Sequence, residues 1–369
     1  MSFDAAENGS ASDAADLFAW LARESRELAP SSVPRLPSPP SALAFSRDYV
    51  ARNLPVVVEG AIAHWPASRG WSPEHMASRA GESALISVNV TPNGLGDALL
   101  ATDGVEVVRA DPDEAGDDDD ETDDAPAPAP PVVFAQPEER SMTFRAFLAE
   151  LNRTRALPAD DPSYCVPYVS RQCGSLREEF PALAAECVDL EWATAAFGAA
   201  PDAVNLWCGD ERARTTFHRD HYENIYCVIN GSKTFELVPP CQGIAMMRAV
   251  TAPAATFEGA AVVLESPARS VRWWADPVAN PGLVDGSKAK ESIEPLTVTV
   301  RAGEALYLPA MWFHAVTQRG AFGDAETGEY VPATAVNFWY DMHFGDRFAW
   351  SAFAEEARRR WGGERVGGG

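Results

Sequence analysis

One stretch of the chain, residues 214–240, limits the possible fold more than any other. It reads RTTFHRDHYENIYCVINGSKTFELVPP and places an Asn-Gly pair between two apolar runs. A type I′ turn needs positive φ at both central residues, so Asn-Gly between apolar runs favours a two-residue β-hairpin. We therefore predict a hairpin that turns at Asn230 and Gly231, with Val228 opposite Lys233.

The same stretch predicts one chemically unusual strand face. Side chains alternate between the two faces of a strand, so His218 and Asp220 should share a face, and hairpin pairing adds residues from the returning strand. A bulge near His218 would change this parity for the first residues. The expected face combines two metal-ligand types with an amide, a phenol and a lysine: His218, Asp220, Tyr222, Asn224, Tyr226, Val228, Lys233, Phe235 and Leu237.

A His-x-Asp pair needs a third ligand to hold a metal ion, and His314 is the candidate. It lies in the segment ALYLPAMWFHAV, residues 305–316, after a turn-like Arg-Ala-Gly-Glu. Two imidazoles and one carboxylate on one side of a metal leave open coordination positions, as in non-haem Fe(II) oxygenases. Because histidine binds several metals, the residues alone leave the metal's identity open.

These elements together resemble the Jumonji C (JmjC) family of 2-oxoglutarate oxygenases. The resemblance rests on His218-x-Asp220, a lysine fifteen residues later (233 − 218 = 15), and a distal His314 after Leu-Pro-x-x-Trp. More narrowly, the chain resembles the bifunctional peptidase and (3S)-lysyl hydroxylase branch of that family. The matching stretches are 43–50, 63–67, 90–94, 168–173, 220–228 and 335–342, so the resemblance spans roughly residues 40–345.

The resemblance implies Fe(II) held by His218, Asp220 and His314, with 2-oxoglutarate as cosubstrate. Lys233 matches the family's lysine for the distal carboxylate, and Thr215 matches its hydroxyl partner, with Thr216 as the alternative. A lysine buried without an anion would lose its charge or destabilise the fold. A bound carboxylate removes that cost.

Further site residues follow from the same resemblance. Tyr168, Asn224 and Asn337 match positions that contact the cosubstrate, and Trp339 matches a strand beside the iron. Core packing is the alternative for Tyr168 and Trp339. Asp341 shares strand parity with Asn337 and Trp339, so it is the expected partner of a substrate ammonium; the alternative is an ordinary acid at a strand end.

The implied reaction consumes O₂ and 2-oxoglutarate, yields succinate and CO₂, and hydroxylates a C–H bond. By resemblance the target is lysyl C3 of a protein substrate such as a translation-associated GTPase. The alternatives are a JmjC demethylase for N-methyl-lysine or arginine, a histone-tail peptidase, and a non-catalytic cupin-like binding module. Peptide hydrolysis has no use for Lys233, and the intact ligand set argues against a module without catalysis.

Composition limits the partners and the compartment. The net charge is −24, from 30 basic and 54 acidic residues, which argues against nucleic-acid or anionic-membrane binding and favours cationic partners. The six cysteines show no CxxC spacing, so we read them as reduced thiols. No apolar run reaches the roughly 18 residues of a membrane span, and the acidic start lacks a signal peptide's pattern. We expect a cytoplasmic or nuclear protein.

Many short strands between Gly and Pro turns predict a mainly β, α+β fold of the barrel or sandwich type. The resemblance implies a double-stranded β-helix, a cupin-like jelly roll with flanking helices. We expect a flexible lead at 1–40 with a helix over 14–29, a catalytic domain at 41–345, and a C-terminal region at 346–369 that consists of a helix (346–361) and a Gly-rich tail (362–369). The helix could pack on its own barrel or support a homodimer.

The segment 109–131 is expected to be a disordered insertion, because its acidic run at 111–124 repels itself and cannot bury apolar surface. A helix is expected over 141–151. The segment 245–290 is rich in Ala, Pro and Gly, and its sequence does not predict which helices or strands it forms.

Overall fold

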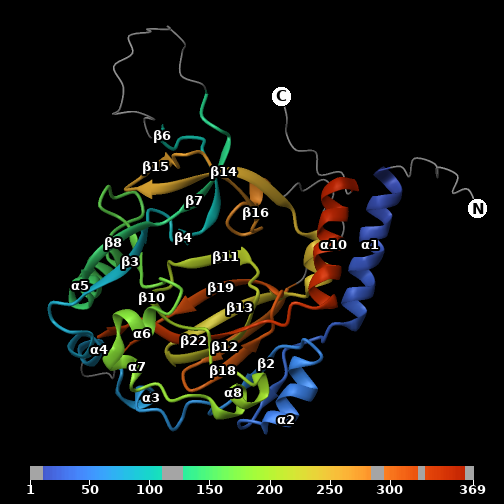
Figure 1. Ribbon diagram of the computed structural model, residues 1–369. Helices are drawn as coiled ribbons and strands as arrows, with labels where there is room; N and C mark the ends of the chain where they lie inside the picture. The colour runs from blue at the N-terminus through green and yellow to red at the C-terminus, as the bar shows by residue number, and fades with distance from the viewer. Residues whose placement is uncertain (1–10, 110–127, 284–294, 323–328, 362–369) are drawn as a thin grey trace, which may run out of the picture.

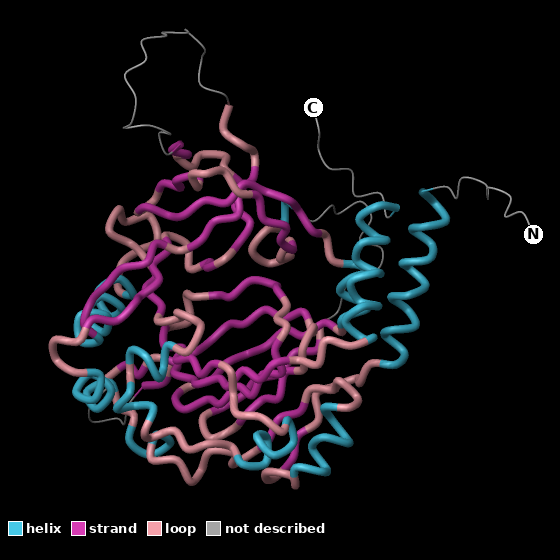
Figure 2. The backbone as a smooth tube through the Cα atoms, in the orientation of Figure 1, coloured by secondary structure: helices cyan, strands magenta, loops and turns pink. Residues whose placement is uncertain are grey.

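Two facing β-sheets form the centre of the molecule (Figures 1 and 2). The computed structural model describes residues 11–109, 128–283, 295–322 and 329–361. The first central sheet runs in the order β1 (Arg35–Leu36), β2 (Val56–Val58), β18 (Ala305–Leu308), β12 (Tyr222–Asn230), β22 (Ala333–Asp341) and β10 (Ala203–Gly209). The second runs in the order β17 (Leu296–Arg301), β13 (Ser232–Val238), β19 (Phe313–Arg319), β11 (Arg214–His218) and β4 (Leu95–Gly96).

The two sheets bury one shared apolar layer. Tyr226 and Val228 from β12 meet Phe235 and Leu237 from β13 in a single cluster of buried side chains, with Val300 from β17. Face-to-face packing of two sheets buries alternate residues of each strand. The predicted cupin-like jelly roll with flanking helices is therefore confirmed.

The predicted hairpin is wrong in its pairing. β12 pairs with β18 and β22, whereas β13 pairs with β17 and β19. Gly231 has φ 68°, but Asn230 does not have a positive φ, so the turn is not type I′. It carries the chain from one sheet to the other, because the two apolar faces are buried against each other as facing layers. The faces predicted for residues 222–237 remain correct for that reason.

The expected continuous strand from His218 to Val228 is also wrong. β11 ends at His218 and β12 begins at Tyr222, and the two strands belong to different sheets. The register of β11 against β19 also shifts between Thr215 and His218, which marks a bulge or irregularity next to the ligands. Residues 219–221 are thus a crossing segment rather than part of a strand.

A third sheet covers one end of the sandwich. It includes strands from the segment 245–290, for which the sequence predicted no elements. It comprises β5 (Ala98–Ala101), β7 (Val132–Gln136), β14 (Ala249–Glu258), β15 (Ala261–Leu264) and β6 (Val107–Arg109), with β16 (Ser270–Trp274) paired to β14. A small sheet lies beside it, in the order β8 (Glu138–Thr143), β3 (Leu85–Thr91) and β9 (Val166–Tyr168). A two-stranded pair joins β20 (Ala321–Phe322) to β21 (Tyr330–Val331).

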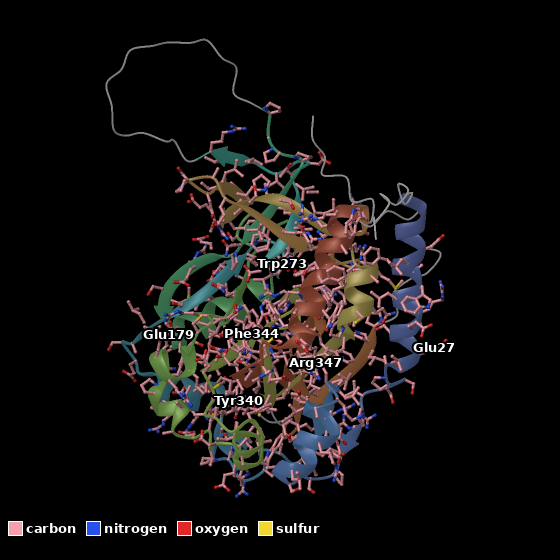
Figure 3. All side chains as sticks on the ribbon, turned by 45° about the vertical axis from the view of Figure 1, so that its right-hand side comes forward. Glu27, Glu179, Trp273, Tyr340, Phe344 and Arg347 are labelled. Atoms are coloured by element: carbon pink, nitrogen blue, oxygen red, sulfur yellow. The ribbon has the colours of Figure 1, made fainter. Side chains whose placement is uncertain are left out.

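Helices flank the sheets. The expected N-terminal helix is α1 (Ala11–Leu28), and the closing helix is α10 (Asp346–Trp361), with the bounds expected for it. Both lie beside α9 (Pro240–Met246), as Figure 3 shows. The remaining helices are α2 (Ala42–Phe45), a π-helical turn (Ser46–Val50), α3 (Ala67–Gly70), α4 (Pro73–Ala80), α5 (Phe144–Arg155), α6 (Ser175–Glu179), α7 (Pro181–Ala184), α8 (Glu191–Phe197) and a 3₁₀ turn (Pro281–Leu283).

The helix predicted over 141–151 begins later than expected. Residues 138–143 pair with β3 as strand β8, and Thr143 then caps α5 by accepting a hydrogen bond from the Ala146 amide at 3.2 Å. The hydroxyl of the cap satisfies a backbone donor that the first turn leaves free.

Several expectations concern residues outside the described ranges. These are the acidic run 111–124, the N-terminal residues 1–10 and the tail at 362–369. Among the described residues, no helix is both long enough and apolar enough to cross a membrane.

Candidate metal centre and the adjoining pocket

Two histidines from neighbouring strands face each other at one end of the second central sheet. His218 closes β11 and His314 lies in β19, and the two are direct cross-strand partners. Their ring centroids are 4.1 Å apart. Residues 96 positions apart in the chain therefore converge because two antiparallel strands pair in this register.

Backbone carbonyls orient both imidazoles in the same way. His218 Nδ1 lies 2.8 Å from the Thr216 carbonyl oxygen, and His314 Nδ1 lies 3.0 Å from the Trp312 carbonyl oxygen. An Nδ1–H that donates to a carbonyl leaves the lone pair on Nε2, which is the usual support for a metal-binding histidine. Burial lowers the pKa of His314 to about 4, so its imidazole is neutral and able to act as a ligand.

Asp220 completes the group from the crossing segment. Its Oδ2 lies 3.6 Å from His218 Nε2 and 3.6 Å from His314 Nε2. Ligand atoms bound at about 2.1 Å to one ion lie roughly 3–4 Å apart, so one cation fits among the three side chains. Within the described part of the chain, this is the set of His, Cys, Asp and Glu side chains that could hold a metal ion.

The crossing segment is held by a second one. Met311 donates its amide hydrogen to the Asp220 carbonyl oxygen at 2.9 Å and has φ 72°. Met311 belongs to the link between β18 and β19, which runs from the first sheet to the second. Two connections that cross the sandwich in opposite directions therefore lie side by side at the candidate metal centre.

A buried cation lies further along the same sheet. Lys233 has an exposed fraction of 0%, and its Nζ donates to Gln318 Oε1 and, at 3.1 Å, to the Tyr168 hydroxyl. Burial lowers the pKa of Lys233 to about 7. No described carboxylate lies within ion-pair distance of Nζ, so the ammonium has only neutral partners.

Gln318 adds an unsatisfied donor to this place. Its Nε2 is buried and has no hydrogen-bond partner. Buried polar groups in native structures are nearly always satisfied. An ammonium and an amide N–H that both lack an acceptor fit an anionic ligand such as a carboxylate.

Strand register relates the cation to the histidines. Lys233 is paired with Gln318, Phe235 with Val316, and Leu237 with His314. The lysine and His314 rows are thus four residues apart along β19, or about 13 Å between backbones. The lysine side chain and a short diacid between them can span that separation.

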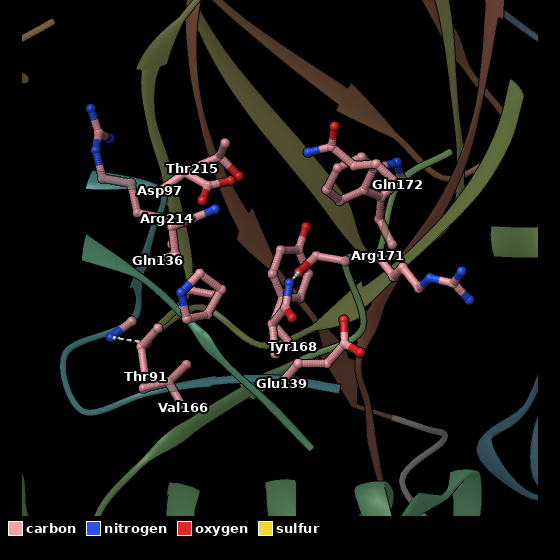
Figure 4. A pocket seen from close by; sticks show the side chains of 17 residues that line it. Thr91, Asp97, Gln136, Glu139, Val166, Tyr168, Arg171, Gln172, Arg214 and Thr215 are labelled. Carbon is pink, nitrogen blue, oxygen red and sulfur yellow. Dashed lines mark hydrogen bonds between the residues drawn. The ribbon is translucent and has the colours of Figure 1, made fainter. Parts of the chain in front are cut away.

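A cavity of 370 Å³ adjoins this place (Figure 4). Tyr168, Thr215 and Trp207 line it, whereas the His-Asp-His group does not. Of the two hydroxyl candidates, Thr215 therefore faces open space. Thr216 is buried and donates to the Asp97 carbonyl oxygen at 2.9 Å, and its role as a cosubstrate contact, like that of Thr215, stays a prediction.

The two predicted asparagines belong to one buried polar network. Asn337 Oδ1 accepts from Asn205 Nδ2 at 3.1 Å and from Trp207 Nε1 at 2.9 Å, and Asn337 Nδ2 donates to Asn224 Oδ1 at 3.3 Å. Asn205 and Trp207 were not predicted. The network holds β10, β22 and β12 in register beneath the pocket.

The two predicted substrate residues lie at the end of β22. Trp339 is buried, its ring stacks on Tyr222 with centroids 4.8 Å apart, and its Nε1 has no partner. Asp341 is exposed and is the cross-strand partner of Tyr222. Their predicted roles toward a substrate stay predictions.

Sequence reasoning missed Gln318 and Trp273. Gln318 lies four residues after His314 on one strand, so alternation alone would have placed it on the ligand face. Trp273 comes from the segment 245–290, for which the sequence predicted no secondary structure. It stacks parallel to His218, with ring centroids 6.1 Å apart and an interplanar angle of 4°. No pattern in the sequence signalled that contact.

A two-sheet jelly roll with two histidines and one carboxylate converging at the mouth defines the class of cupin-type metal sites. Comparison with known proteins agrees: the model of the cupin-like domain family matches residues 42–346. The chain is 34% identical over 349 residues to lysine-specific demethylase JMJ32 of Arabidopsis thaliana, covering 91% of this chain and 89% of that protein.

Two further relatives carry JmjC names. The chain is 36% identical over 335 residues to the bifunctional peptidase and (3S)-lysyl hydroxylase JMJD7 of Homo sapiens, covering 88% of this chain and 89% of the relative. It is 27% identical over 362 residues to JmjC domain-containing protein E of Dictyostelium discoideum, covering 93% and 94%. The chain belongs to the cupin-like JmjC family, whose members are 2-oxoglutarate oxygenases, and the predicted resemblance is confirmed.

Proposed function

We propose that the protein is an Fe(II)- and 2-oxoglutarate-dependent hydroxylase of lysyl residues in a protein substrate. The observation that carries the proposal is the pairing of a His-Asp-His group with a buried lysine that lacks a carboxylate partner. A metal alone would explain the first group, whereas an anion bound beside Lys233 would explain the second. The lysyl hydroxylase assignment draws on the printed name of the human relative.

The residues present fit the two cofactors. His218, His314 and Asp220 would hold Fe(II), because two neutral imidazole nitrogens and one carboxylate oxygen form the set that leaves coordination positions open. Bound iron and 2-oxoglutarate would supply the oxygen chemistry that couples decarboxylation to C–H hydroxylation. Lys233 and Gln318 would bind the distal carboxylate of the cosubstrate, and Thr215 offers a hydroxyl toward the same space.

The surrounding residues would keep this space dry and ordered. Phe235, Leu237 and Trp312 form part of the buried layer next to the lysine. A charge-assisted hydrogen bond gains strength where water is excluded. The protein's contribution is therefore to fix ligand orientation, neutralise the cosubstrate and exclude solvent.

The identity of the substrate belongs to the proposal. A lysine-containing protein suits the acidic chain, and translation-associated GTPases are the first class to test. Trp339 and Asp341 are proposed contacts at the mouth of the sandwich. We propose a cytoplasmic or nuclear location on the cysteine usage alone.

Demethylation of N-methyl-lysine is a second candidate, because the plant relative is named a lysine-specific demethylase. It would use the same metal and cosubstrate residues. Mass spectrometry of lysyl and N-methyl-lysyl peptides separates the two reactions: hydroxylation adds one oxygen, and demethylation removes a methyl group.

Succinate production tests the shared chemistry. We expect the wild-type protein to convert 2-oxoglutarate to succinate with Fe(II) and O₂, and we expect His218→Ala to abolish this turnover because one of the three metal ligands is lost. His221→Ala is the matched control, since His221 neighbours Asp220 but is absent from the ligand group. Full turnover in His218→Ala would overturn the iron assignment.

A further inference from the structure

The cavity beside the metal ligands is lined by two acidic and two basic side chains. Its charged lining residues are Asp97, Glu139, Arg171 and Arg214. Both arginines are neutralised elsewhere: Arg214 by Glu236 and Asp276, and Arg171 by Glu178 and Glu179. Neither Asp97 nor Glu139 forms an ion pair with a described residue. Asp97 and Glu139 are therefore the lining groups with which a cationic ligand could form an ion pair.

Asp97 is tied to the ligand strand through one intermediate residue. The Thr216 hydroxyl donates to the Asp97 carbonyl oxygen at 2.9 Å, and the Thr216 carbonyl oxygen lies 2.8 Å from His218 Nδ1. Thr216 thus contacts the backbone carbonyl of Asp97 through its hydroxyl and the His218 imidazole through its own carbonyl. Figure 4 shows Asp97 beside Thr215 on the wall of the cavity.

The backbone around Asp97 is under unusual constraint. Asp97 has φ 50°, a region that non-glycine residues rarely occupy. Just before it, β4 pairs in parallel with β11, with Gly96 opposite Thr215. A Cβ at Gly94, which has φ 78°, would lie only 2.0 Å from the Arg212 carbonyl oxygen. The segment 94–97 is therefore packed closely against β11, the strand that ends at His218.

We propose that Asp97 binds the ammonium group of the substrate lysine, with the adjoining cavity accommodating the residues around it. This inference rests on the proposed function and names a substrate contact that the sequence did not suggest. Strained backbone persists where the surrounding structure enforces it, and such positions concentrate at binding sites.

The electrostatics agree with this role. Burial raises the pKa of Asp97, and a hydrogen bond with the Gln136 side chain acts in the opposite direction. A lysyl ammonium would stabilise the ionised carboxylate in the same way. Asp341, the acid expected from sequence, is exposed, and an ion pair in full contact with water contributes little. Asp97 is thus better placed to recognise a cation.

The test compares binding of two peptide pools by full-length protein variants. Each peptide in the first pool has one central lysine among random uncharged residues, and norleucine replaces that lysine in the second pool. Retention is measured with Mn(II) and 2-oxoglutarate present, and again without them. We expect wild-type protein to retain the lysine pool about tenfold more than the norleucine pool, as a buried charge-assisted contact would give.

The variants are chosen to keep the backbone conformation. Asp97→Asn and Asp97→Gly remove the charge, and both new residues tolerate positive φ. We expect each to lose most of the preference for lysine. Asp103→Asn is the matched control, because Asp103 is an exposed aspartate six residues away, and Asp341→Asn tests the rival acid. Asp103→Asn should keep the preference.

The outcomes separate the inference from the proposed function. An unchanged lysine preference in both Asp97 variants, or a loss confined to Asp341→Asn, would overturn the inference, and so would a wild-type protein without any preference. If Asp97 proves necessary for lysine binding but no peptide gains oxygen during turnover, the inference stands and the proposed hydroxylation fails.

Discussion

At the scale of single residues, the most informative side chain is Lys233. A fully buried ammonium with two neutral partners is costly unless an anion joins it. Its neighbours are placed to receive that anion, since Gln318 offers an unused N–H and Tyr168 a hydroxyl. The buried lysine thus points to an organic acid more directly than the histidines do.

Substitution of Lys233 tests this assignment. We expect Lys233→Ala and Lys233→Met to weaken 2-oxoglutarate binding about 10- to 100-fold, because a charge-assisted hydrogen bond contributes roughly 1.5–3 kcal/mol. Binding of Mn(II) in the absence of cosubstrate should change little, since Lys233 lies four strand positions from the His314 row. Calorimetry measures both affinities. Equal losses of metal and cosubstrate binding would contradict the assignment.

At the scale of elements, α9 supports the strand that carries His314. Gly243 of α9 is so close to Phe313 of β19 that an added Cβ would lie 2.2 Å from the ring. Phe313 is fully buried and immediately precedes His314. The position of the histidine therefore depends on a helix that has no direct contact with a metal.

Gly243→Ala measures this dependence. We expect a loss of about 1–3 kcal/mol in the free energy of unfolding, the usual cost of overpacking a core, together with weaker metal binding. Gly70→Ala is the control, because an added Cβ there meets nothing within 4 Å. Chemical denaturation reports the stability. Equal stability of the two variants would show that α9 can shift to accommodate the added methyl group without loss of unfolding free energy.

The closing helix packs inside the molecule and leaves three large apolar side chains exposed. α10 packs on α9 and α1, yet Trp350, Phe353 and Trp361 are exposed. Both expectations for this helix, packing on its own domain and support of a homodimer, are compatible with this arrangement. The homodimer stays a prediction.

Much of the site could be predicted from sequence, because ligand spacing and strand parity are local properties. His218, Asp220 and His314 could be named from their motifs, and the structure brings them together. Lys233 could be named in the same way and is buried, while its role toward a cosubstrate stays a prediction. Pairing could not be predicted, because the apolar pattern of 222–237 fits a hairpin and two facing strands equally well. Trp273 was missed because β16 pairs with the third sheet, whose strands come from segments without clear periodicity, and Asp97 because it lies in the short link between β4 and β5.

At the scale of the whole molecule, the buried lysine couples stability to pH. Burial lowers the pKa of Lys233 from 10.5 to about 7 in the folded protein. Between these values the unfolded chain binds more protons than the folded one, so stability without cosubstrate should rise with pH. Below pH 7 both states are charged, and above pH 10.5 both are neutral, so the contribution then stays constant.

The difference in unfolding free energy between the wild type and Lys233→Met isolates this effect. We expect the unfolding free energy of the wild type, relative to that of the variant, to rise by up to about 1.4 kcal/mol per pH unit between pH 7 and 10.5. Saturating 2-oxoglutarate and Mn(II) should reduce the slope, because a bound carboxylate keeps the ammonium charged. Denaturant titrations across this range measure it. A difference independent of pH would show that Lys233 is solvated in the folded protein.

The two crossing segments joined by Met311 and Asp220 have a mechanical consequence. His218 and His314 belong to one sheet, and Asp220 lies in the segment that connects it to the other sheet. An ion bound by all three side chains would therefore cross-link the two sheets. Movement of one sheet relative to the other would then separate the three ligand atoms. Binding of the ion would therefore make the sandwich more rigid and complete the ligand set at the same time, and loss of the ion would reverse both.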